Sequence, residues 1–481
     1  MKAKILVIWM LAYVFGVMIA PTINIESNLL LVAGGLVCLF SFLLIRRPYI
    51  FGVFFGLGII FLAIGNFGYQ AEKMILANEQ LSGKKLKMQL MINDIPQSTP
   101  YGFKVGARIN KISGNNVSMP DLLLYLPVSS ELKYGELVAA EVTPKKFDEK
   151  TQWALIKNRY FAQASAKNIK VAGVSTGWSD IFRGWLLGLR ISLNTSIARA
   201  LPAPEAALAS GLILGEKALI SPEMTRLLQA SGTTHIIALS GYNITIIMGL
   251  FIFMRQRFSR LVNLLIPVGV ILLFTIMTGA APSLVRAALM GSLPLLGRYL
   301  GRESDNFIAI LLSAVIMSVF NPFLPIYDVG FQLSFVAFIG IAYIAPILQG
   351  ILERSKISFS GILTETIGAQ IATIPLLMYY FGTFSVVSPF ANVVILTLVP
   401  IGMLLSFLVG LAGMVSSATG NFLAVPTYIL LHFIIESIRY FGSLPWASWK
   451  IKIENPMWIF IFYLILFDFW FMLNKFVKKD Q

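Results

Sequence analysis

Long apolar runs recur along most of this chain, separated by short polar stretches. Runs of about 17–25 apolar residues are long enough to cross a bilayer as helices. Three of them open the chain, at roughly 4–21, 28–45 and 50–68, and the first should be a retained helix because no small-residue cleavage site follows it. Ten further candidates follow, at roughly 205–220, 233–253, 261–279, 283–300, 305–321, 328–347, 361–381, 389–411, 418–440 and 456–474.

Residues 71–175 show a different pattern, in which apolar and polar positions alternate. KLKMQLMINDIPQSTPYGFKVGARINKI alternates around a QSTPYG turn, and further strand candidates follow in DLLLYLPV, ELVAAEVTP and YFAQASAKNIKVAGV. Five or so short strands in about a hundred residues predict a small β-barrel of the OB kind, with a sandwich as the alternative.

Residues 176–204 separate this segment from the second set of apolar runs. GWSDIFRGWLLGLRISLNTSIARAL places apolar residues at helical spacing together with Trp and Arg. That combination predicts an amphipathic helix lying in the membrane interface, or a connector helix packed on the bundle.

These patterns predict a polytopic α-helical membrane protein with an inserted small all-β, OB-like extracytoplasmic domain. The composition agrees, since 57% of residues are hydrophobic and 13% are charged, against about 25% charged in soluble domains. Lys2 and Lys4, and then Arg46 and Arg47, should be cytoplasmic by the positive-inside rule, so the third run exits on the far side. Four parts follow, at 1–70, 71–175, 176–204 and 205–481.

The predicted β domain is strongly basic. Residues 82–172 contain 14 Lys and Arg against 7 Asp and Glu, a balance of +7 within a chain of formal net charge +15. A basic groove with aromatic faces is how OB folds hold single strands. The aromatic residues interleaved with these cations include Tyr101, Phe103, Tyr125, Phe147, Trp153, Tyr160 and Phe161. The alternative is a solubilising surface with the aromatics in the core. The candidate surface residues are Lys84, Lys85, Lys87, Lys104, Arg108, Lys145, Lys146 and Arg159.

Polar residues also interrupt the apolar runs of the second half. The stretch THIIALSGYNITIIMGLFIF contains His235, Ser240, Gly241 and Asn243. A break at Ser240-Gly241 would let these groups converge on a wet path or site, whereas the simpler alternative is hydrogen bonding between helices.

Three more apolar stretches contain polar residues: TGAAPSLVRAALMG, DVGFQLSF and GAQIATIPLLMYYFGTFS. Pro282 suits the first turn of a helix, which places Arg286 near its positive end, a natural anion site. The alternative is an Arg286 paired with a buried acid such as Asp328 or Glu436. Gln332, Ser334 and Gln370 complete the set of candidate pathway residues.

Several chemistries are disfavoured by residue counts. Cys38 is the single cysteine, so no internal disulfide can form, and two histidines, His235 and His432, are too few for a zinc site of several His and Cys. No Walker loop is present, because GLILGEKA lacks the required spacing. No metal or other cofactor is expected.

Four stretches together resemble the ComEC-type DNA-uptake channel family over roughly 205–410. They are GEKALISPEMTRLLQASGTTHIIALSGYNITII, TGAAPSLVRAALMGSLPLLGR, NPFLPIYDVGFQLSFVAFIGI and QIATIPLLMYYFGTFSVVSPFANVVILTLVPIG. The 71–175 segment, above all PKKFDEKTQWALIKNRYFAQA, is similar to the family's N-terminal OB-like domain.

The resemblance implies a channel, not an enzyme, that passes single-stranded DNA across the cytoplasmic membrane during natural transformation. It implies an outer DNA-receptor protein, a cytoplasmic DNA-translocating ATPase and the lipid bilayer itself as partners. Two departures matter. The family often has His where this chain has Asn243, and many members carry a C-terminal metallo-β-lactamase-like domain that this chain lacks, so a separate nuclease is expected.

Two other functions fit parts of the pattern. An intramembrane serine hydrolase would use Ser240 with His432 or His235 as base, but ALSGYN lacks a glycine two residues before the serine. A secondary transporter or flippase for another anionic polymer or a lipid-linked saccharide would also use broken helices, and OB folds bind oligosaccharides too.

Overall fold

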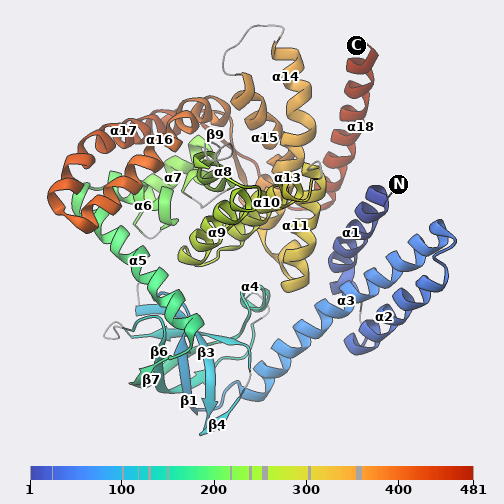
Figure 1. Ribbon diagram of the computed structural model, residues 1–481, viewed down its shortest axis with the longest axis horizontal. Coiled ribbons are helices and arrows are strands. Elements are labelled where there is room, and N and C mark those ends of the chain that lie inside the picture. The colour runs from blue at the N-terminus through green and yellow to red at the C-terminus, as the bar shows by residue number, and fades with distance from the viewer. Residues whose placement is uncertain are drawn as a thin grey trace. The chain divides into compact units, whose positions relative to one another are not determined.

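The computed structural model describes residues 2–23, 25–99, 102–117, 119–127, 132–148, 151–216, 219–237, 241–251, 258–301, 305–353 and 360–479. The chain divides into two compact units (Figure 1). Unit 1 comprises residues 1–188, 259–279 and 288–328, and unit 2 comprises 189–258, 280–287 and 329–481.

Unit 1 combines membrane-type helices with all the strands of the predicted β domain. Its elements are α1 (Lys2–Ile19), η1 (Ala20–Thr22), α2 (Ser27–Leu43), α3 (Pro48–Leu81), β1 (Leu86–Ile92), β2 (Gln97–Thr99), β3 (Gly102–Ile112), β4 (Asn115–Asn116), β5 (Asp121–Leu126), β6 (Glu136–Pro144), α4 (Gln152–Lys157), β7 (Tyr160–Val174), the first half of α5 (Trp178–Ala200), α9 (Val262–Met277), most of α10 (Pro282–Tyr299), α11 (Asn306–Phe320) and α12 (Leu324–Tyr327).

Unit 2 is almost entirely helical. It contains the second half of α5, α6 (Glu205–Leu214), α7 (Pro222–Ser231), η2 (Thr234–Ile236), α8 (Gly241–Leu250), the first turns of α10, α13 (Val329–Ile339), the π-helical turn η4 (Gly340–Ile344), α14 (Ala345–Glu353), α15 (Ser360–Tyr380), β8 (Thr383–Ser385), α16 (Ser388–Val415), α17 (Ser417–Ser443), β9 (Ser448–Lys450) and α18 (Met457–Lys479).

The predicted multi-pass membrane protein is confirmed, with fewer long spans than the thirteen expected. Within the described residues, six helices are long and apolar enough to cross a membrane: Ile5–Thr22, Pro48–Leu81, Val329–Gly350, Gly361–Tyr380, Ser388–Val415 and Ser417–Ser443. Five apolar helices are shorter: Ser27–Leu43, Glu205–Leu214, Val262–Met277, Phe307–Phe320 and Met457–Met472. The expected span at 233–253 is interrupted, since a 3-10 turn at Thr234–Ile236 precedes a ten-residue helix that begins at Gly241.

Helix α3 continues well beyond the apolar run that predicted it. It extends for 34 residues to Leu81, past the expected start of the β domain at residue 71, and the first strand begins at Leu86, within the predicted KLKMQLMINDI segment. Ala71, Met74 and Ala77 recur at helical spacing and are buried in the same core as the strands. Packing of this apolar face against the strands therefore keeps the helix intact beyond the apolar run at 50–68.

A buried amide fixes the end of α3 to the strands. Asn78 is 1% exposed, and its Nδ2 donates to the carbonyls of Lys145 and Phe161, each at 3.0 Å. Its Oδ1 accepts from the backbone N–H of Phe147 at 3.0 Å. One side chain thus bonds to three backbone groups, two in the connection after β6 and one at the start of β7.

Five of the strands close into a ring. β1 pairs with β3, β3 with β5, β5 with β7, β7 with β6, and β6 again with β1. The β5–β7 pairing is parallel and the other four are antiparallel. Inward-facing side chains fill the ring, and those of Leu90, Ile92, Leu122, Val142 and Phe161 are fully buried. The predicted small β domain is therefore present, and we refer to this ring as the barrel.

Within unit 1, α4 and the residues that follow it are bound to the α11–α12 connection. The Lys157 Nζ lies 3.4 Å from the Asp328 carboxylate, and the Arg159 guanidinium donates to the Phe320 carbonyl at the end of α11. Asn321 donates back to the Lys157 carbonyl at 2.8 Å, and the Trp153 and Tyr327 rings stack at 4.5 Å. These contacts tie one end of the barrel to a helix of its own unit.

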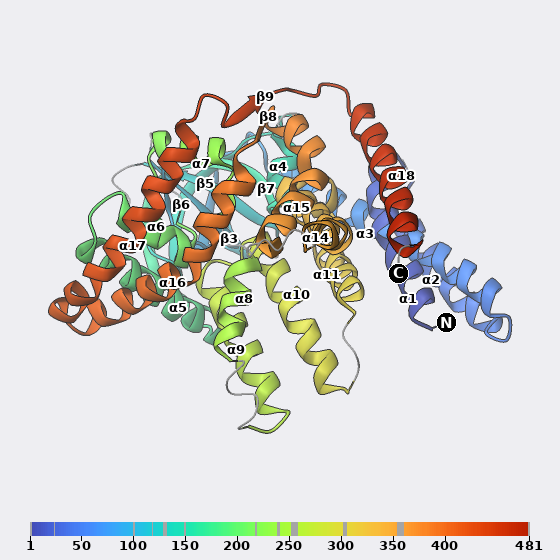
Figure 2. The same cartoon turned by 90° about the horizontal axis from the view of Figure 1, so that it is seen from above.

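In unit 2, α16 and α17 lie side by side (Figures 1 and 2). A Cβ at Gly420 would lie 2.8 Å from the Gly413 Cα, so this position has no room for a side chain. All ten residues of α6 are buried. β8 and β9 pair through Ser385 and Ser448, which fixes the start of α16 to the segment after α17.

Helix α5 has the exposed aromatic face that the sequence predicts. Trp178 is 88% exposed and Trp185 is 63% exposed, with Phe182 between them also exposed. In unit 1, Arg183 instead covers the Tyr134 ring at 5.4 Å. The interfacial position of this helix stays a prediction.

Candidate functional site

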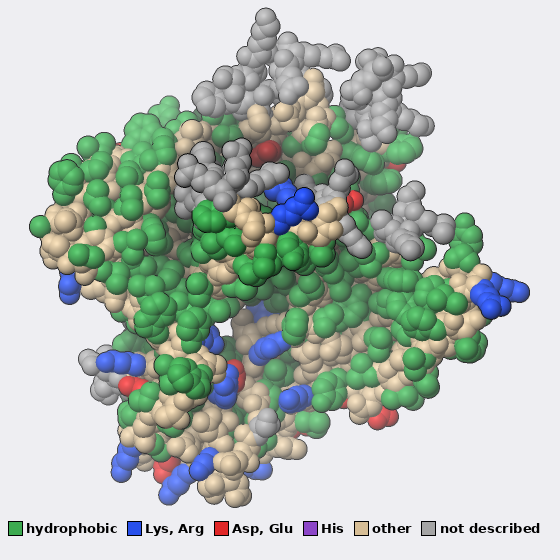
Figure 3. All heavy atoms as spheres, viewed as in Figure 1, with side chains coloured by type: hydrophobic (Ala, Val, Ile, Leu, Met, Phe, Trp, Pro, Cys, Tyr) green, Lys and Arg blue, Asp and Glu red, His purple; other side chains and the backbone are tan. Residues whose placement is uncertain are grey.

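Cations are spread over the outside of the barrel, where Figure 3 shows Lys and Arg side chains on the face drawn. Seven of the eight predicted surface cations are exposed and Lys104 is half-buried. They come from several strands and loops. Lys87 lies opposite Glu141 on β6, and Arg159 is bound to the Phe320 carbonyl. Arg108 alone among them lines a groove.

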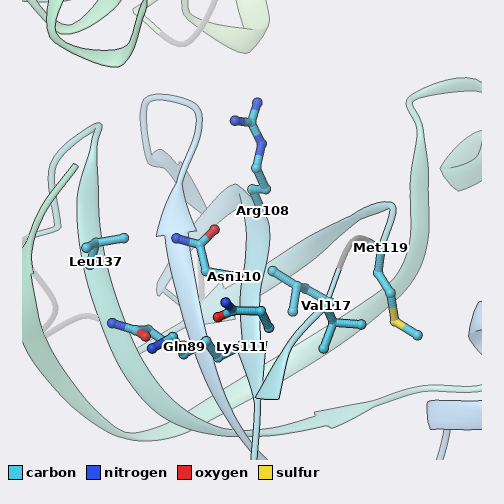
Figure 4. A pocket seen from close by; sticks show the side chains of 9 residues that line it. Gln89, Arg108, Asn110, Lys111, Val117, Met119 and Leu137 are labelled. Atoms are coloured by element: carbon cyan, nitrogen blue, oxygen red, sulfur yellow. The ribbon is translucent and has the colours of Figure 1, made fainter. Parts of the chain in front are cut away.

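That groove is open and has a volume of about 590 Å³ (Figure 4). The side chains that line it come from β1, β3, β4 and β6 and the segment after β4: Gln89, Arg108, Ile109, Asn110, Lys111, Asn116, Val117, Met119 and Leu137. Sequence reasoning missed its three amides. The signal was the alternation itself, because inward-facing Val105, Ala107 and Ile109 leave Asn110 pointing out.

Most aromatics of the β domain do not form an exposed stacking surface. Phe161 is fully buried, and Phe103, Phe147 and Trp153 pack against the core. The Tyr160 hydroxyl lies over Gly106 on β3. Tyr101 lies outside the described residues. Of the six described aromatics that were expected to stack on bases, Tyr125 is the exposed one, at 40%.

A polar cluster lies beside Arg108. Asn93 Nδ2 donates to Asp121 Oδ2 at 2.7 Å. Burial raises the pKa of the Asp121 carboxyl, while Arg108, Asn93 and more distant arginines oppose the shift. Burial, together with Asp94 and Asp121, also raises the pKa of Tyr160 to about 12, so its hydroxyl stays neutral at physiological pH.

In unit 2, Arg286 is held inside the protein. It lies one turn after Pro282 on α10 and is 5% exposed. Its Nη2 donates to the Ser334 hydroxyl on α13, and its guanidinium lies 5.8 Å from the centre of the Phe335 ring. Gly241, at the start of α8, lies next to Ala287. The structure therefore brings Arg286 and Ser334 together from two helices, with Gly241 of a third helix against the residue after Arg286.

The acids considered as partners for Arg286 both form ion pairs with other residues. Asp328 binds Lys157, and Glu436 binds Arg439 at 2.5 Å on the same helix. Gln332, two residues before Ser334, accepts a hydrogen bond from the Tyr380 hydroxyl at 2.7 Å. Gln332 is thereby linked to the end of α15.

Two other predicted residues bind backbone carbonyls. Asn243 is 2% exposed and donates to the Leu212 carbonyl of α6 at 2.9 Å. Gln370 Nε2 donates to the Ser385 carbonyl. His235 lies in η2 with an exposed side chain, and Ser240 lies outside the described residues. Asn243 thus makes the hydrogen bond between helices that was the alternative to a pathway role.

The second histidine forms a separate pair. His432 Nδ1 lies 2.8 Å from Oε1 of Glu205, a residue that is 3% exposed at the start of α6. The pair connects α17 to α6. Among the described residues, no three His, Cys, Asp or Glu side chains are grouped as metal ligands.

A family model described as "Competence protein" matches residues 212–476, more than half of the chain. The chain belongs to the competence protein family. The matched segment includes Arg286, Ser334 and Gln370, whereas the barrel precedes it.

A curated relative agrees with this assignment. The chain is 30% identical over 214 residues to ComE operon protein 3 of Bacillus subtilis (strain 168). The aligned stretch covers 43% of this chain and 26% of the relative. The match thus spans about a quarter of that relative. No solved structure matches the chain.

Proposed function

We propose that this competence protein is a channel that passes single-stranded DNA across the cytoplasmic membrane during natural transformation. The observation that carries the proposal is the buried Arg286, bonded to Ser334 inside the segment that the family model matches. A guanidinium in a membrane bundle is costly and marks substrate pathways. Arg also matches the phosphate group in geometry and charge.

The barrel would capture the strand on the outer side of the membrane. Its ring of five strands, closed by one parallel pairing, supports an OB-like fold. Its excess of cations supports a polyanionic ligand. An extracytoplasmic position is supported by Arg46 and Arg47, which precede α3 and favour a cytoplasmic start for that helix.

The protein would act as a channel and not as an enzyme. A receptor outside the membrane would deliver DNA, and a cytoplasmic ATPase would supply the work, because the sequence has no Walker loop.

DNA uptake in a deletion strain tests this function. Labelled DNA that enters cells is separated from surface-bound DNA by its protection from added nuclease. We expect the deletion strain to bind DNA but to internalise none, and the wild-type gene to restore entry. Normal entry without the gene would overturn the proposal and favour transport of another anionic polymer or a lipid-linked saccharide.

A further inference from the structure

The open groove on the barrel combines amide side chains with cations. Arg108, Asn110 and Lys111 are contributed by β3, Gln89 by β1 and Asn116 by β4. Figure 4 shows these side chains on neighbouring strands, with Val117 and Met119 along one side. Its volume of about 590 Å³ falls in the range of about 300–1,000 Å³ that is usual for ligand sites.

The register of the strands places these groups within reach of one another. Gln89 lies opposite Lys111 in the β1–β3 pairing, and Asn116 lies opposite Lys111 in the β3–β4 pairing. Lys111 is therefore flanked by an amide on each side. Directly opposite residues have Cβ atoms about 4.5–5.5 Å apart, so one ligand group can contact a cation and an amide together.

The chemistry of the lining fits a strand with both charge and base edges. The cations attract phosphates and release counterions, whereas amides exchange donor and acceptor bonds with nucleobases. None of the described residues that line the groove has an aromatic side chain on which a base or a sugar ring could stack. Recognition here would rest on hydrogen bonds and charge, unlike the usual stacking on OB surfaces.

A second candidate site on the barrel already contacts other parts of the chain. The connection between β6 and β7, one of the loops with which OB folds bind ligands, contains α4, which contacts α12 through the Trp153–Tyr327 stack. Arg159 of the same connection is bound to the Phe320 carbonyl. The groove is open, whereas a ligand would compete with these contacts at the connection.

We propose that this groove binds a short stretch of single-stranded DNA, with phosphates on Arg108 and Lys111 and base edges on Gln89, Asn110 and Asn116. The proposal rests on the proposed function, because it names the place where the barrel holds the same cargo. It further assigns base-edge contacts to amides that add no charge.

Binding to the full-length protein in lipid nanodiscs tests the groove. A 5′-labelled single-stranded oligonucleotide is titrated at several salt concentrations, in parallel with an abasic strand of equal length. We expect Lys111→Gln to weaken both strands several-fold and to reduce the slope of log affinity against log salt by about 0.7, the share of one phosphate contact. Asn110→Ala should weaken the base-bearing strand several-fold, with the slope unchanged.

Matched substitutions outside the groove provide the controls. Lys170 on β7 and Gln97 on β2 are also exposed strand residues of the barrel. Lys170→Gln and Gln97→Ala should therefore bind as the wild type does, and all variants should keep wild-type thermal unfolding.

Three results would contradict all or part of the proposal that the groove binds single-stranded DNA. If the wild type binds DNA and either Lys111→Gln or Asn110→Ala binds it with wild-type affinity, the groove is not the binding site. The proposed channel function would be unaffected. Equal losses in Asn110→Ala for abasic and base-bearing strands would overturn the base-edge contacts. Absence of binding in the wild type would overturn the groove as well, and nuclease-protected uptake would then decide the channel separately.

Discussion

The barrel and the helices of unit 2 use polar side chains in opposite ways. On the barrel, Arg108 and Lys111 extend into an open groove. In unit 2, Asn243 and Gln370 are bonded to backbone carbonyls of the chain. Water solvates polar groups on a barrel surface, whereas polar groups in a bundle must find partners in the protein. A polar residue in an apolar run is therefore structural unless something further distinguishes it.

Charge distinguishes Arg286 from Asn243. Both are buried, but Asn243 is a neutral amide that donates to a backbone carbonyl, whereas Arg286 carries a permanent charge and five N–H donors. The comparison therefore predicts that Arg286 contacts the transported DNA, whereas Asn243 stabilises the fold. The substitutions below test that division.

Arg286→Ala should have the largest effect on transport. Hydrogen bonds that involve a charged group contribute about 1.5–3 kcal/mol, so we expect uptake to fall by about ten- to a hundredfold. The measurement is nuclease-protected DNA entry, normalised to the amount of protein in the membrane.

Two variants separate the charge from the packing. Arg286→Lys keeps the charge without the planar fork and should retain part of the uptake, whereas Ser334→Ala removes the partner hydroxyl and should cost less than Arg286→Ala. Uptake by Arg286→Ala at the wild-type level per molecule would end the pathway role of this residue.

The sequence alone did not predict which polar residues stabilise the fold and which are candidates for contact with DNA. Apolar runs and alternation predicted the membrane helices and the β domain because each depends on local periodicity. The extension of α3 to Leu81 was missed, because Ala71, Met74 and Ala77 are buried only once the strands are present. Likewise, the bond from Asn243 to the Leu212 carbonyl joins residues 31 positions apart, and no local pattern reports it.

Gly232→Ala should have the next largest effect, and it should act on folding. Gly232 ends α7 with a φ of +74°, and a Cβ at this position would lie 2.5 Å from that of Ser388. The left-handed conformation costs about 1–2 kcal/mol for a residue with a Cβ, and overpacking adds about 1–3 kcal/mol. We expect less protein in the membrane and a lower unfolding temperature, with normal uptake per remaining molecule.

Asn243→Ala tests the structural side of the comparison directly. The substitution removes a bond between α8 and α6, and hydrogen bonds between membrane helices contribute about 0.6–2 kcal/mol. Thermal stability in detergent should fall modestly, and uptake should fall only in proportion to the amount of protein. A loss of uptake per molecule as large as that of Arg286→Ala would move Asn243 to the pathway.

Asp328→Asn should have a smaller effect, confined to unit 1. The Lys157–Asp328 pair is partly exposed, with side chains 24% and 19% accessible, and such pairs contribute at most about 1 kcal/mol. Limited proteolysis should show slightly faster cleavage near α4. Since Arg159, Asn321 and the Trp153–Tyr327 stack remain, the barrel should stay bound to α12, and its release would show that this pair dominates the contact.

Asp121→Asn should have the smallest effect and the opposite sign. The Asp121 carboxylate partly neutralises Arg108 at the edge of the groove, so its removal should strengthen binding of single-stranded DNA about two- to threefold at low salt. Because burial raises the pKa of Asp121, lowering the pH through that value protonates the carboxyl and should strengthen wild-type binding in the same way. In Asp121→Asn this part of the pH dependence should disappear, which titrations of affinity against pH for both proteins would measure. Identical pH profiles would show that Asp121 does not tune Arg108, and the groove would then depend on its own cations and amides alone.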